Sequence, residues 1–116
     1  MKEILLTLTF SLFLLFSGGL KAQDLSKSDK LDYQIDKVYP NPAREFVFVE
    51  VFSDNYGTIR FELIDILGNT VKKWDKKELT PGTQKIRFEL QKFSSGFYLL
   101  KADKQGQIII KRLRKL

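Results

Sequence analysis

The sequence predicts an all-β protein, an immunoglobulin-like antiparallel β-sandwich of about seven strands. Runs of β-branched and aromatic residues recur after Pro42 at spacings of about ten residues, with turn-forming residues between them. No stretch has both the length and the 3.6-residue apolar period of a globular helix. In addition, Pro40 and Pro42 flank Asn41, and no helix can pass through this segment because each proline restricts the residue before it to extended geometry.

The first 22 residues have the pattern of a signal peptide. A short basic start precedes the apolar run Ile4–Phe16, which is shorter than the roughly 20 residues that a membrane-spanning helix needs. Ala22 then supplies a small residue for cleavage. We expect residues 1–22 to be removed, which would leave no transmembrane segment. An uncleaved N-terminal anchor is the competing interpretation, and a lipoprotein is excluded because the chain has no cysteine to acylate.

Residues 23–37 are polar and charged, and they predict a short exposed leader ahead of a single domain over residues 38–116. Leu31 and Ile35 lie four residues apart and could form one weak helical turn. Residues 34–39 equally fit a further strand that leads into the proline segment.

The run Arg44–Phe52 predicts a strand that is apolar on both faces. Three valines share one face, whereas Glu50 shares the other face with three phenylalanines. Burying an unpaired carboxylate is costly, so we assign the Glu50 face to the outside. The phenylalanines beside it are then either covered by the leader or the basic tail, or free as a partner-binding face. These residues are Phe46, Phe48 and Phe52.

Residues 58–65 and 70–74 predict a hairpin. In its loop, Gly68 is expected to take a positive φ, and the Asp65 carboxylate is expected to accept backbone N–H groups across the turn. Residues 75–82 predict a charged connection that ends in the turn Thr80-Pro81-Gly82.

Three more strands complete the predicted sandwich. Residues 83–90 alternate most regularly between apolar and charged side chains, which indicates one buried face and one wet face. Residues 96–102 begin with Gly96, which permits a bend or a close backbone approach. Residues 107–113 form the last predicted strand, and a basic tail follows it over residues 114–116.

The composition excludes most catalytic chemistry. Histidine and cysteine are absent, which removes the usual general base, the thiol nucleophile and most zinc sites. Asp65 is the only acid in a distinctive setting, and turn capping explains it better than catalysis does. We therefore expect no enzyme, no cofactor and no metal. The net charge of +6 favours either anionic partners or solvated strand faces, and export argues against nucleic acid.

Four short motifs follow one another along the chain. They are Tyr39-Pro40-Asn41-Pro42-Ala43, Leu63-x-Asp65-x-x-Gly68-x-x-Val71, Ser95-Gly96-x-Tyr98-x-Leu100 and Lys111-x-Leu113. In order and spacing they resemble the C-terminal sorting domain of the type IX secretion system, also called the Por secretion system sorting domain, type A. The resemblance covers residues 38–116.

The resemblance implies a function in protein export by Bacteroidota. Its members cross the inner membrane by a signal peptide, are recognised in the periplasm as folded domains, and pass through the outer-membrane translocon to the cell surface or the medium. The implied partners are translocon and shuttle components, a surface sortase and anionic lipopolysaccharide. The implied sorting-motif residues are Tyr39, Pro40, Asn41, Pro42, Asp65, Gly68, Gly96, Tyr98, Lys111 and Leu113. Among them, we expect the last strand and tail to make the recognition contacts, because an edge strand is open to a partner.

Family members usually carry a large cargo ahead of this domain, whereas here only residues 23–37 separate the expected cleavage point from the first motif. The chain is therefore expected to be either the remnant of a longer cargo protein or a bare domain that works by itself. The alternative function is a standalone surface binding or adhesion module that uses the face of Phe46, Phe48 and Phe52.

Overall fold

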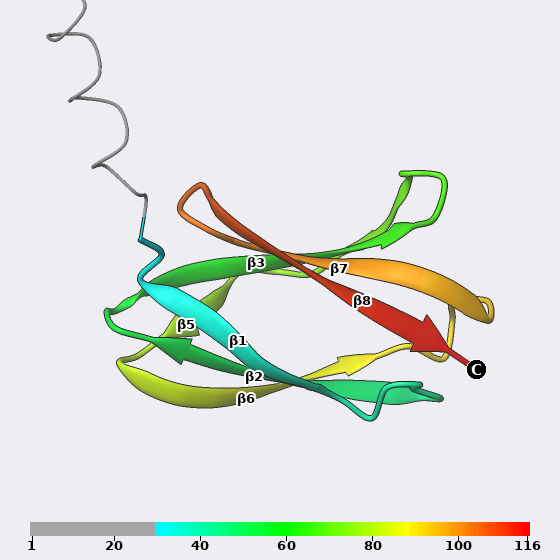
Figure 1. Ribbon diagram of the computed structural model, residues 1–116, viewed down its shortest axis with the longest axis horizontal. Coiled ribbons are helices and arrows are strands. Elements are labelled where there is room, and N and C mark those ends of the chain that lie inside the picture. The colour runs from blue at the N-terminus through cyan, green and yellow to red at the C-terminus, as the bar shows by residue number, and fades with distance from the viewer. Residues whose placement is uncertain (1–29) are drawn as a thin grey trace, which may run out of the picture. The chain divides into compact units, whose positions relative to one another are not determined.

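The computed structural model of the chain describes residues 30–116 (Figure 1). The expected signal peptide and residues 23–29 of the expected leader lie outside the described residues. Among residues 30–116, no helix is long and apolar enough to cross a membrane.

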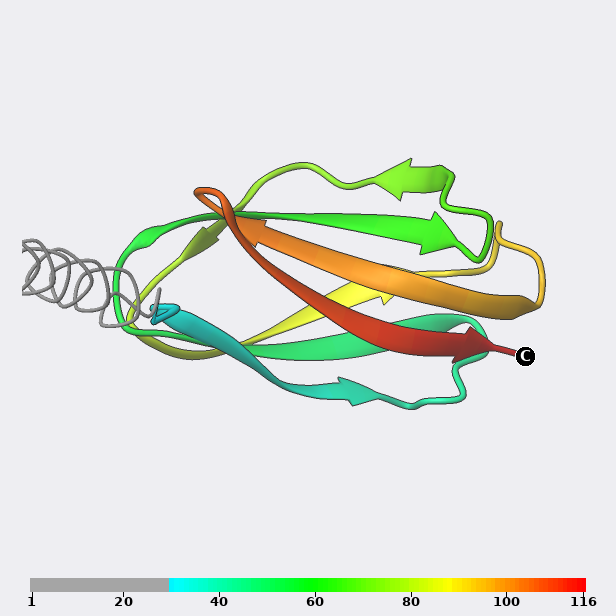
Figure 2. The same cartoon turned by 45° about the horizontal axis from the view of Figure 1, so that its top comes forward.

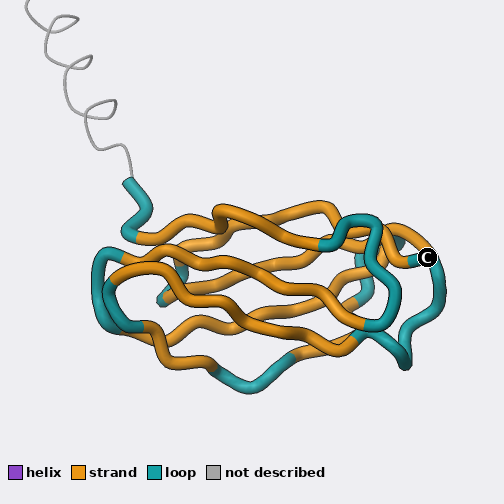
Figure 3. Tube along the Cα trace, turned by 90° about the horizontal axis from the view of Figure 1, so that it is seen from below, coloured by secondary structure: helices purple, strands orange, loops and turns teal. Residues whose placement is uncertain are grey.

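Two antiparallel sheets form the fold. The strands are β1 (Tyr33–Tyr39), β2 (Phe46–Ser53), β3 (Gly57–Asp65), β4 (Thr70–Lys73), β5 (Lys77–Leu79), β6 (Gly82–Glu89), β7 (Gly96–Lys104) and β8 (Gln107–Lys115). The smaller sheet has the order β1-β2-β6, and the larger one has the order β4-β3-β7-β8, with β5 paired to β3. The sheets lie one above the other with loops at both ends (Figures 2 and 3). The predicted all-β sandwich is confirmed, with eight strands in the described residues rather than about seven.

The core lies between the two sheets and follows from the period-two alternation of the strands. All three valines of β2 are fully buried, and the outward-facing residues of β2 are only partly buried, which confirms the two faces that the sequence predicts. Phe61 of β3 meets Phe88 of β6 across the core with ring centroids 4.9 Å apart. Trp74 also packs against Phe88, with ring centroids 4.5 Å apart. Aromatic contacts thus join the sheets without any disulfide.

The region expected to be an exposed leader contains β1 instead, from Tyr33 onward. Tyr33 and Ile35 are buried in the core, and β1 pairs with β2 along its whole length. Charged neighbours such as Asp36 and Lys37 give this stretch a polar composition, but they lie on its exposed side. The expected leader over residues 23–37 is therefore not exposed at Tyr33 and Ile35, and the strand that residues 34–39 suggested is present.

The charged connection predicted over residues 75–82 also contains a short strand, β5. It pairs with the start of β3 from Gly57 to Ile59, and its one apolar residue, Leu79, is buried. A three-residue strand with a single buried side chain has no detectable period, so no sequence pattern predicts it.

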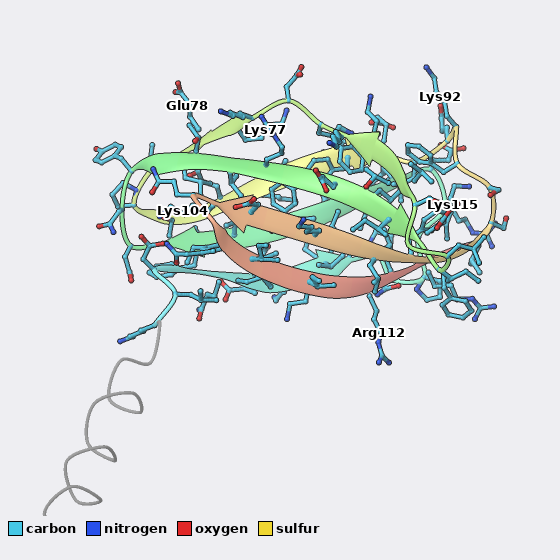
Figure 4. All side chains as sticks on the ribbon, turned by 90° about the horizontal axis from the view of Figure 1, so that it is seen from above. Lys77, Glu78, Lys92, Lys104, Arg112 and Lys115 are labelled. Carbon is cyan, nitrogen blue, oxygen red and sulfur yellow. The ribbon has the colours of Figure 1, made fainter. Side chains whose placement is uncertain are left out.

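An ion pair between the buried Lys104 and the partly buried Asp32 ties the residue before β1 to the end of β7. The side chain of Lys104 has no exposed surface, and its ammonium group lies 2.9 Å from Asp32 Oδ1 and 3.1 Å from Ser53 Oγ. Asn55 Nδ2 donates to the second Asp32 oxygen at 3.2 Å. Lys104 lies at the opposite end of the sandwich from Lys115 (Figure 4).

We expect this ion pair to make the fold sensitive to acid. The hydrogen bond from Lys104, opposed by partial burial, lowers the pKa of Asp32 below its ordinary value of 3.8. Because the folded-state pKa is the lower one, the ionised carboxylate stabilises the fold above about pH 4, and this contribution is lost as the pH falls through the folded-state pKa. Urea unfolding at pH values above and below this range should show it. The Asp32→Asn variant should lack this part of the pH dependence, and equal acid sensitivity of the two proteins would contradict the expectation.

Candidate functional site

The four sequence motifs converge on one row that crosses the larger sheet. Asp65 at the end of β3 pairs with Tyr98 on β7, and Tyr98 pairs with Leu113 on β8. The side chain of Asn41 continues the row beyond β8, because it bonds to the residues on either side of Leu113. Residues far apart in the sequence therefore form a single structural feature at one end of the sandwich.

Asn41 closes part of the free edge of β8. Its Nδ2 donates to the Arg112 carbonyl at 3.1 Å, and its Oδ1 accepts from the Arg114 N–H at 3.0 Å. The side-chain amide of Asn41 thus makes the two hydrogen bonds that the backbone of one residue in a neighbouring strand would make. Ala43 continues the pairing, since its N–H donates to the Arg114 carbonyl at 2.8 Å and its carbonyl accepts from Leu116 N–H at 2.8 Å. Both peptide bonds before the prolines, Tyr39–Pro40 and Asn41–Pro42, are cis.

Asp65 and Gly68 build a tight hairpin tip, as the sequence predicts. Asp65 Oδ1 accepts the N–H groups of Leu67 at 3.0 Å and Asn69 at 2.8 Å, and Gly68 has φ of 90°. Only glycine adopts this backbone readily. The tip displays two aliphatic side chains, with Ile66 76% and Leu67 82% exposed. The hydrogen-bonded turn therefore presents the side chains of Ile66 and Leu67 to solvent.

Several motif residues stabilise the fold and are not exposed to a partner. Tyr98 is buried, and its hydroxyl donates to the Ser94 carbonyl at 2.6 Å. Leu113 is buried beside it, and Gly96 has φ of 153°, which a side chain would strain. Asn41, Lys111 and both prolines are exposed. A partner can reach this exposed subset directly, whereas the buried residues act by shaping the strands.

The predicted partner face on β2 is largely covered by the protein itself. Lys85 Nζ lies 4.3 Å from the ring centroid of Phe48, and the Arg87 guanidinium lies 4.2 Å from that of Phe46. Tyr39 packs beside Phe48 at 5.7 Å. Cation–π contacts of this kind shield aromatic rings from water. Within residues 30–116, these covering side chains come from strands β1 and β6.

An open apolar surface that the sequence reasoning missed lies on the outer face of the larger sheet. A hollow of about 310 Å³ is lined there by Ile66, Phe97, Tyr98, Leu99 and Arg112. Phe97 is 60% exposed, and the Arg114 guanidinium lies 5.4 Å from its ring centroid. The available signal was the alternation of Phe97 and Leu99 with the buried Tyr98 and Leu100. The side chain of Arg112 extends beyond the margin of the sheet (Figure 4).

Comparison with known proteins agrees with these motifs. Residues 37–115 match a family model described as the secretion system C-terminal sorting domain. Among solved structures, the fold is similar to part of dimeric latent PorU from Porphyromonas gingivalis, with a TM-score of 0.61 and 19% sequence identity. That alignment covers 72% of this chain and 9% of the PorU chain, so the chain spans a small part of PorU. No curated protein matches.

Proposed function

This chain belongs to the family of type IX secretion C-terminal sorting domains, and we propose that the export machinery recognises it through β8 and the residues that follow. Membership implies interaction with the secretion machinery and a secreted or cell-surface location. Passage through the periplasm, a shuttle or sortase partner and attachment to anionic lipopolysaccharide belong to the proposal. The division of the chain into a signal peptide over residues 1–22, a leader and a sorting domain is also part of the proposal.

One observation carries the proposal. The row of motif residues from Asp65 through Tyr98 ends at β8, the last strand of its sheet. Strand β8 has no acidic residue, and four basic ones lie in its second half, which are Lys111, Arg112, Arg114 and Lys115. Asn41 fixes this half of the strand in place. A partner would therefore meet a rigid, basic strand held at the margin of the sandwich.

Adhesion through Phe46, Phe48 and Phe52 is less favoured. These side chains are partly buried, and the cations of Lys85 and Arg87 already occupy the ring faces of Phe48 and Phe46. A second protein would have to displace them before it could contact the rings.

Export of a reporter tests the function. We expect residues 30–116, fused behind a periplasm-targeted fluorescent protein, to carry it to the surface or the medium of a bacterium with a working type IX system. The fusion has to include Tyr33 and Ile35, because a domain cut at residue 38 would lack two core residues. A strain without the translocon is the control. Reporter retained in the periplasm of both strains would contradict the sorting function.

A further inference from the structure

Strand β8 has one edge without a partner strand. It pairs with β7 in unbroken register and is the last strand of the larger sheet. The N–H and C=O groups of successive strand residues point alternately to the two sides. Because Arg114 directs both of its groups to Asn41 and Ala43, away from β7, the same orientation holds for Arg112, Ile110 and Ile108.

Another segment satisfies this edge at its C-terminal end. The Asn41 and Ala43 pairing covers it from the Arg112 carbonyl onward. The start of β8 is anchored at Gln107, whose backbone groups point to β7 by the same alternation: the Tyr33 hydroxyl donates to the Gln107 carbonyl at 2.6 Å, and the Asp32 N–H donates to Gln107 Oε1 at 2.9 Å. Between these anchors lies what we call the open edge, which consists of both backbone groups of Ile108 and Ile110 and the N–H of Arg112. Within residues 30–116 none of these groups has a hydrogen-bond partner.

The side chains along the open edge combine apolar and basic character. Ile108 is 48% exposed and Ile110 is 51% exposed, on the same face as Arg112. Lys111 is exposed as well, although its position in the alternation matches the core-facing Ile109 and Leu113. A lysine at such a position discourages pairing with arbitrary strands. The open edge therefore disfavours pairing with strands that cannot accommodate the charge of Lys111.

We propose that the open edge binds an extended polypeptide segment of the export machinery, which adds to the larger sheet as a strand beside β8. This inference rests on the proposed function and specifies its partner. Unpaired alternating donors and acceptors fit an extended backbone, which supplies both along its length. Apolar side chains of the segment would lie opposite Ile108 and Ile110, and carboxylates opposite Lys111 and Arg112.

Two other occupants fit less well. A second copy of β8 would bring a second set of basic side chains to the edge and supply no carboxylate, because β8 has no acidic residue. An anionic lipid surface would attract the arginines and lysines but would leave the strand's N–H and C=O groups without a matching partner. Acidic polypeptide satisfies both the charges and the backbone.

Proline at position 110 tests strand addition. Ile110→Pro removes an N–H that points to solvent, and edge strands tolerate proline at such a position. The β7–β8 ladder uses the neighbouring residues, so the thermal unfolding midpoint of the full chain should stay within a few degrees of that of the wild type. Surface delivery of the fused reporter should fall about tenfold or more. Ile110→Val, which keeps the N–H, should be delivered normally.

Charge provides the second arm of the test. The pair Lys111→Glu with Arg112→Glu should also reduce delivery, because it repels an acidic segment. If Ile110→Pro is delivered normally while the charge variant is not, strand addition is overturned in favour of a lipid or other anionic surface. If both folded variants are delivered normally, the open edge is not the recognition site, although the sorting function stands. Retention of the wild-type reporter would overturn the sorting function itself.

Discussion

Replacement of Asp32 with alanine is expected to destabilise the domain by about 3–5 kcal/mol, because it leaves a buried ammonium group without its counter-charge. Lys104 is fully buried, and Ser53 Oγ would be its only remaining contact among those described, at 3.1 Å. The free energy of unfolding can be measured by urea titration near neutral pH. Asp36→Ala is a matched control, since Asp36 is a nearby exposed acid within β1, and it should change the stability by no more than about 0.5 kcal/mol.

A double mutant separates the ion pair from other effects. Lys104→Met fills a similar space without charge, so the variant with both Asp32→Ala and Lys104→Met should regain most of the lost stability. Replacing both members of a buried ion pair by apolar groups is often neutral, whereas removing one member is not. An Asp32→Ala variant as stable as the Asp36→Ala control would show that the pair contributes little.

Phe88→Ala is expected to cost about 3–5 kcal/mol through loss of burial and a residual cavity. Phe88 packs against both Phe61 of the opposite sheet and Trp74, so its removal eliminates both ring contacts. Domains of this size have a total stability of roughly 5–15 kcal/mol. We therefore expect the variant to be close to unfolding at 37 °C and to be a poor sorting domain for that reason alone.

The tryptophan provides the measurement. Trp74 is the only tryptophan in the chain and packs directly on Phe88, so its fluorescence should report the unfolding transition. Phe97→Ala is the matched control, because it removes the same side chain from an exposed site on the outer face. Its effect should stay within about 0.5 kcal/mol. Similar losses in the two variants would contradict the position of Phe88 at the centre of the core.

Local patterns were sufficient for most of the strands. Glu50 correctly identified the outer face of β2, and alternation correctly identified the buried face of β6, because both signals come from neighbouring residues. The Asp65 turn was equally predictable, since the side chain bonds within its own loop. Strand β1 was harder, because Tyr33 and Ile35 are separated by polar residues and become core residues only through β2.

The features that were not predicted depend on partners distant in the sequence. Lys104 ends a strand next to a turn, where a lysine is normally exposed, and only Asp32 and Ser53 make its burial possible. The bonds of Asn41 to Arg112 and Arg114 are invisible without the sheet order. The same holds for the open edge, since an unpaired strand cannot be recognised until all pairs are known. Whether the sorting-motif residues make recognition contacts stays a prediction.

The contacts that hold β1 and Asn41 to the far end of the chain have a kinetic consequence. Asp32 with Lys104, Tyr33 with Gln107 and Asn41 with Arg114 are separated by 72, 74 and 73 residues. Domains dominated by such non-local pairs fold in roughly milliseconds to seconds, because loop closure precedes any stabilising contact. We therefore expect the two sheets to close only after residues 107–116 have reached the same compartment as β1. Until then the chain would stay loose enough to be threaded across a membrane.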